Sequence, residues 1–252
     1  MPGYVSHTIM AKDVYQKLKN KNCDLLYLQT YSLGGDLCKY AKCRYASHHK
    51  DMDKFIYNMA DYLKDNNLTN NKALLGVLYG HICHYIMDNT IHSLVRIVDK
   101  TCQKNKNNHT MIELYYDAYL SKTICNIRID KYNKEKILSA KTNKEINKMI
   151  DYVYTKTYNT NHVSWYYLFN LGLYRKIKYL YLIFGYNLLK KLSGINKFLL
   201  TNKDIDLLNN EHLITYQNYQ KKECHDDLLT AYNISITRAI KYIDDINKYL
   251  NI

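Results

Sequence analysis

Residues 80–92 read GHICHYIMDNTIH, which places three histidines and one aspartate inside a short apolar run. Imidazole and carboxylate groups are costly to bury unless they are paired, hydrogen-bonded or bound to a metal. Each residue of a helix advances by about 100°, so His84, Asp88 and His92 share one face, with His81 in the same sector. Neutral imidazoles and carboxylates are zinc ligands. The spacing therefore predicts a buried helix with a metal-binding face.

The composition around this stretch predicts an all-α fold, a single-domain multi-helix bundle. The chain of 252 residues has one proline and eight glycines, far fewer turn residues than a β-sandwich or barrel needs. Gly76 and Gly80 would let another segment approach the predicted metal-binding helix closely. Apolar residues at helical spacing predict helices over 6–19 (with Ser6 as N-cap), 48–63, 73–95, 109–120, 143–158 and 228–250. We expect one domain over 1–252, in which 1–122 carries the metal site and the helical part 123–252 packs on it.

Charge and cysteine content bear on partners and compartment. The formal net charge of +13 favours nucleic acids or an anionic membrane, although the scattered lysines also fit a general bias in residue usage. Seven cysteines without a Cys-x-x-Cys pair suit a reducing compartment. We find neither a signal-peptide pattern nor about 18 consecutive apolar residues, so the sequence predicts a cytoplasmic location.

Further candidate ligands flank the central stretch. In HTMIELYYD, His109 and Glu113 share a helix face at i, i+4, and Asp117 continues it. Asp36 follows two adjacent glycines, on a tight turn or helix start. The full set of candidate ligands is His7, Asp36, His48 or His49, His84, Asp88, His92, His109 and Glu113. Eight donors are too many for one tetrahedral zinc and suit two or three ions.

In this order the residues resemble the zinc-dependent phospholipase C family, in its bacterial phospholipase-like branch. That family shares a helical fold with the P1-type nucleases. The resemblance rests on SHTI at 6–9, GGDL at 34–37, GHICHYIMDNTIH, HTMIELYYD and, near the C-terminus, LNNEHLITYQNY at 208–219. Relatives often have Gly-Pro-Asp where this chain has Gly-Gly-Asp.

The resemblance implies a role for each candidate. Paired zinc ions would be held by Asp36, His48, His84 and Asp88, with His7 completing one of the two sites. The remaining site would comprise His92, His109 and Glu113. His49 is the alternative to His48, and His81 would orient a ligand or line the pocket. Asp36 and Glu113 are the candidate catalytic residues, which could orient a water or pass its proton.

A zinc-bound hydroxide attacking a phospholipid phosphodiester is the activity that the resemblance implies. Two alternatives stay open. A P1-type single-strand nuclease would use the positive charge and the 28 tyrosines to bind nucleic acid. A catalytically inactive helical protein stabilised by metal is the other. The aromatic and basic stretch 165–192 is either a core helix pair or a lipid-facing surface that makes peripheral membrane contact.

Overall fold

The computed structural model describes residues 3–38, 51–101, 108–132, 134–172 and 228–252, with only the backbone described for 92–101 and for most of 108–115. These residues form helices and contain no strand, which confirms the all-α prediction. The elements are α1 (Tyr4–Lys17), α2 (Leu25–Tyr31), η1 (Gly34–Cys38), α4 (Met52–Asp65), α5 (Lys72–Thr101), α6 (Asn108–Cys125), η2 (Ile129–Lys131), α7 (Lys134–Ile137), α8 (Lys144–Tyr158) and α12 (Leu228–Leu250). A further helix covers 163–172.

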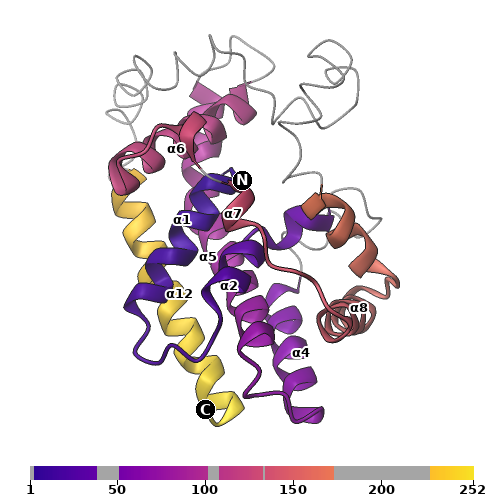
Figure 1. Ribbon diagram of the computed structural model, residues 1–252. Coiled ribbons are helices and arrows are strands. Elements are labelled where there is room, and N and C mark those ends of the chain that lie inside the picture. The colour runs from indigo at the N-terminus through magenta and orange to yellow at the C-terminus, as the bar shows by residue number, and fades with distance from the viewer. Residues whose placement is uncertain (1–2, 39–50, 102–107, 133, 173–227) are drawn as a thin grey trace.

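Helix α5, which contains the opening stretch, is the centre of the fold. It packs against α1, α2, α4, α6, α12 and η1 (Figure 1). The close approach predicted at its glycines is confirmed, because a Cβ on Gly80 would lie 2.8 Å from the Leu28 carbonyl oxygen of α2. A Cβ on Gly76 would likewise lie 2.7 Å from the Asp24 carbonyl oxygen. Alanine at either position would force α2 away from α5.

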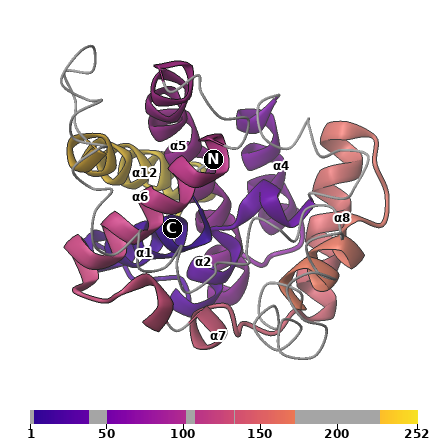
Figure 2. The ribbon, with the colours of Figure 1, turned by 90° about the horizontal axis from the view of Figure 1, so that it is seen from above.

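Helix α12 and helix α8 lie on opposite sides of the molecule (Figures 1 and 2). α12 packs mainly on α5, and α8 packs on α4. The inward side chains of α12 recur at helical spacing, including Ile236, Ala239, Ile243 and Ile246. Because this apolar stripe is buried against α5, α12 lies beside the helix that carries His84 and Asp88. Among the helices described, none is both long and apolar enough to cross a bilayer.

The start of helix α1 differs from the prediction. We expected Ser6 to be the N-cap, but α1 begins at Tyr4 with Gly3 at the N-cap position and no side-chain cap there. Ser6 lies within the helix, buried, and its hydroxyl donates to Asp117 of α6. The backbone N–H groups of Val5 and Ser6, in the first turn of α1, therefore donate to a distant carboxylate rather than to a local side chain.

Other boundaries shift by a few residues. Helix α5 extends to Thr101, beyond the predicted 73–95, and α6 covers Asn108–Cys125 rather than 109–120. Helix α2, which we had not predicted, is capped by Asp24, whose Oδ1 accepts from the N–H groups of Leu26 and Tyr27. The predicted helix over 48–63 is described from Met52 onward, so His48 and His49 lie outside the described residues.

Candidate metal centre

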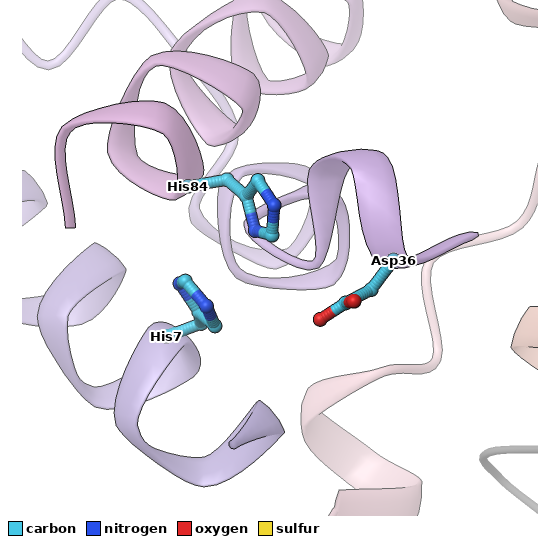
Figure 3. A group of neighbouring side chains, drawn as sticks. All are labelled: His7, Asp36 and His84. Atoms are coloured by element: carbon cyan, nitrogen blue, oxygen red, sulfur yellow. The ribbon is translucent and has the colours of Figure 1, made fainter. Parts of the chain in front are cut away.

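Three side chains from three separate elements converge in the interior. His7 of α1, Asp36 of η1 and His84 of α5 each direct a ligand atom toward the others, as Figure 3 shows. These atoms all lie within 4.8 Å of one another, and all three residues are buried. Since buried imidazoles and carboxylates gather at such distances only when something compensates their burial, this group is the best candidate metal centre among the described residues.

Asp88 adds a second carboxylate, one turn beyond His84 on α5. Its Oδ2 lies 3.5 Å from Nε2 of His84, and its Oδ1 lies 3.4 Å from Nε2 of His7. The two imidazole rings stack with centroids 4.5 Å apart. Burial alone would raise the pKa of Asp88, but the imidazoles of His84 and His7 outweigh it and hold that pKa well below its ordinary range.

The ring of His84 is oriented by the backbone. Its Nδ1 lies 3.0 Å from the carbonyl oxygen of Ser32, at the end of α2. A carbonyl can only accept, so Nδ1 carries the proton and donates it. When the imidazole is neutral, its lone pair is then on Nε2, the atom that faces Asp88. This pattern is typical of metal-binding histidines, whose second nitrogen donates to a carbonyl or carboxylate.

The hydrogen bonding of His7 indicates whether the residues of this group fit a metal ion. His7 is buried, yet neither of its ring nitrogens makes a hydrogen bond with any described residue. Leaving such a group unsatisfied costs about 1–3 kcal/mol. Two imidazoles with two carboxylates form a donor set that suits zinc. The residues present therefore fit a zinc ion, which would supply the missing partner of His7.

Gly34 lets the η1 turn come close to α5. Its φ is +43°, in the left-handed region, and a Cβ there would lie 2.4 Å from Cγ of His84. Two residues onward, the N–H of Asp36 donates to the carbonyl of Leu33 at 2.9 Å and fixes the backbone that carries the carboxylate. A side chain at Gly34 would push Asp36 and His84 apart.

Asp117 holds the beginning of α1 in place. Its Oδ1 accepts from the backbone N–H of Ser6 at 2.9 Å and from the Ser6 hydroxyl at 2.5 Å, while Oδ2 accepts from the N–H of Val5 at 3.3 Å. Burial raises the pKa of Asp117 to about 6, and the hydrogen bonds from Ser6 and Val5 limit that rise. The residue directly after Ser6 is His7, so this carboxylate positions a candidate ligand. The sequence signal was its place on the His109–Glu113 face.

His81 lies in the aromatic core beside the centre. Its Nδ1 donates to the Val77 carbonyl at 2.8 Å, so Nε2 accepts from the Tyr167 hydroxyl at 2.9 Å. The hydroxyl of Tyr154 lies 3.0 Å from the hydroxyl of Tyr167, and the ring of Phe55 packs against the imidazole of His81. Burial lowers the pKa of His81 to about 4, which keeps the ring neutral. Both described partners of His81 thus belong to the core rather than to the candidate ligands.

The structure brings together four of the predicted ligands: His7, Asp36, His84 and Asp88. Glu113 is buried on α6, a helix that packs against both α1 and α5. The remaining candidates cannot be placed against these, because His48 and the side chains of His92 and His109 lie outside the described residues.

Comparison with known proteins identifies a family. The family model described as "Zinc dependent phospholipase C" matches residues 6–166, more than half of the chain. The matched region begins one residue before His7 and includes every candidate ligand. No curated protein and no solved structure matches the chain.

Proposed function

Because the chain belongs to the zinc-dependent phospholipase C family, we propose that it hydrolyses the phosphodiester bond of phospholipids with the help of bound zinc. The observation that carries this proposal is the Asp88 carboxylate set between two buried imidazoles, with its oxygens 3.4 Å from His7 and 3.5 Å from His84. A carboxylate so placed can bridge two cations, which is how paired metal sites are commonly built.

We assign the ligands as follows. His7, Asp36, His84 and Asp88 would hold the paired ions together with His48, and His92, His109 and Glu113 would hold a further one. When bound, zinc lowers the pKa of a water molecule toward neutrality and neutralises charge on the phosphate. The assignment of the described residues is supported by their burial, by the orientation of His84 and by the hydrogen-bond deficit of His7.

The chain's own residues would contribute orientation and proton transfer. The Ser32 carbonyl holds the proton of His84 on Nδ1, so Nε2 remains available as a ligand throughout the reaction. The lowered pKa of Asp88 favours its anionic form, which would balance the positive charge of bound zinc. Asp36 and Glu113 are the two remaining buried carboxylates among the assigned ligands, and one of them would accept the proton of the attacking water.

We propose a phospholipid as the first candidate substrate, because the matched family is one of phospholipases C. The net charge of +13 keeps single-stranded nucleic acid as the second candidate, since Lys and Arg attract the phosphate backbone. The two substrates share the phosphodiester and differ in the leaving group, so the same centre could serve either. Direct comparison of the substrates therefore decides between them.

The first experiment pairs metal content with turnover. Purified protein is expected to contain about two or three zinc ions per chain by elemental mass spectrometry, and to hydrolyse a chromogenic nitrophenyl phosphodiester in a chelator-sensitive way. Phosphatidylcholine vesicles and single-stranded DNA are then offered to the same preparation. Zinc without turnover on any of the three would favour a structural metal, and a protein without zinc would contradict the proposal.

A pair of variants ties the result to the centre. His84→Ala should reduce the zinc content and abolish turnover, because it removes a ligand from α5. His162→Asn is the matched control: His162 is exposed, and its φ of +58° is one that asparagine tolerates. Equal zinc content in both variants would show that His84 is not a ligand.

A further inference from the structure

The helix over 163–172 presents three large apolar side chains to solvent. Trp165 is 62% exposed, Leu168 is 42% exposed and Phe169 is 51% exposed. Their i, i+3, i+4 spacing places them on one face, and the rings of Trp165 and Phe169 stack with centroids 5.6 Å apart. Single exposed hydrophobic residues are ordinary, but a contiguous patch that includes a tryptophan marks a binding surface. We call these three residues the Trp165 patch.

The opposite face of the same helix is buried against η1 and α5, two elements that carry candidate ligands. Asn170 donates from Nδ2 to the carbonyl of Leu37, the residue after Asp36, at 2.6 Å. Tyr167 donates to His81 of α5. A helix is about 10 Å across including side chains, so the Trp165 patch is separated from the structures that carry the ligands by about one helix diameter.

We propose that the Trp165 patch docks the protein on an anionic phospholipid surface. Tryptophan is enriched where one part of a side chain is apolar and another meets water, as at a membrane interface. Charge supports a membrane of anionic lipid as the occupant: the chain carries +13, and the sequence after the helix reads LYRKIKYL at 173–180, with three cations in eight residues. Apolar contact and electrostatic attraction act together in interfacial binding.

This inference rests on the proposed function, because a phospholipid substrate is met by the protein at a membrane surface. It also makes a claim of its own, since binding to vesicles is measured without turnover. The experiment below therefore separates the two.

Trp165 is the only tryptophan of the chain, so its fluorescence reports on the patch alone. The full-length protein is mixed with vesicles of phosphatidylcholine with one-quarter phosphatidylserine. We expect the emission to shift to shorter wavelength, and acrylamide to quench it less, once vesicles are added. An emission that is already blue and protected without vesicles would overturn the proposal, because another part of the chain would then cover the patch.

Vesicle sedimentation of variants provides the second measurement. Trp165→Ser combined with Phe169→Ser should weaken partitioning to these vesicles by about tenfold or more. The matched control is Ile124→Ser combined with Ile127→Ser, which removes two apolar side chains that are 38% and 39% exposed elsewhere on the surface. Equal partitioning of the patch variant and the control would overturn the proposal.

Soluble and vesicular substrates distinguish the failure of this inference from that of the proposed function. The patch variant should hydrolyse the soluble nitrophenyl diester as the unaltered protein does, and lose activity on vesicles in step with partitioning. Vesicle binding by an unaltered protein that hydrolyses no diester would uphold the docking surface and contradict the proposed function. Full activity of the patch variant on vesicles would support the proposed function and contradict the docking surface.

Discussion

Asp117 accepts hydrogen bonds from both the backbone N–H and the hydroxyl of Ser6, a residue 111 positions earlier in the chain. This contact joins the α6 helix, which carries Glu113, to the first turn of α1, which carries His7. Two helices that contribute candidate ligands are thus fixed to each other by a buried carboxylate. The geometry of the centre depends on a residue that is not itself a candidate ligand.

Removing that carboxylate should loosen the start of α1. We expect Asp117→Ala to lower the free energy of unfolding by about 2 kcal/mol, the cost of a lost helix cap together with unsatisfied buried donors. Zinc content should fall as well, because His7 directly follows Ser6. Asp117→Asn retains an oxygen that can accept from Ser6 and should keep more of both properties. Chemical denaturation and elemental analysis measure the two effects; equal losses in both variants would argue against a positioning role.

Gly34 should tolerate no side chain. In Gly34→Ala, the new Cβ would meet the His84 ring and the backbone would be held at an unfavourable φ, at a cost of about 1–3 kcal/mol. We expect a lower unfolding midpoint and weaker zinc binding. Gly172→Ala is the matched control, since a Cβ there has no atom within 4 Å. If both variants unfold at the same denaturant concentration, η1 does not rely on this close approach.

Helical periodicity was enough to predict much of the fold. The predicted helices 143–158 and 228–250 agree closely with α8 and α12, because each combines a regular apolar stripe with clear ends. Helix α2 was missed because its seven residues are too few to show a period. The cap of α1 was assigned wrongly because the group that satisfies it comes from α6, and no local pattern encodes a partner so distant in sequence.

For the candidate site too, contacts within one helix could be predicted from the sequence, and contacts between helices could not. The i, i+4 spacing predicts that His84 and Asp88 meet on one helix face, and they do. His7 and Asp36 were candidates by residue type, and no spacing predicts that they meet His84, because their convergence depends on how α1 and η1 pack on α5. His81 shares the sector of His84 in the sequence, yet its nitrogens are taken by Val77 and Tyr167. Spacing identifies a face but not the partners across it.

His81 should make the metal-free protein sensitive to acid. Its pKa is lowered from 6.5 to about 4 in the fold, so the unfolded chain binds a proton over that range and the folded chain does not. Stability is therefore full above pH 6.5 and should decline by about 3 kcal/mol as the pH falls toward 4. Denaturant unfolding at a series of pH values, in chelator, measures this decline.

The control for the acid effect is His81→Gln, which cannot be protonated in this range. Its stability in chelator should decline less between pH 6.5 and pH 4 than that of the unaltered protein. The comparison uses the slopes, because the substitution also changes packing against Phe55 and so shifts stability at every pH. Parallel curves would assign the acid sensitivity to groups other than His81.

Zinc should stabilise the fold through Asp88. A ligand that binds only the folded state at 1,000 times its Kd adds about 4 kcal/mol, so chelation should lower the thermal midpoint and added zinc should restore it. In Asp88→Asn the carboxylate between His7 and His84 is lost, and we expect most of the zinc-dependent gain to disappear. Asp65→Asn, at an exposed position at the end of α4, is the matched control and should respond to zinc as the unaltered protein does. An undiminished gain in Asp88→Asn would place the stabilising ion elsewhere, since loss of a carboxylate that bridged two ions would weaken the binding of both.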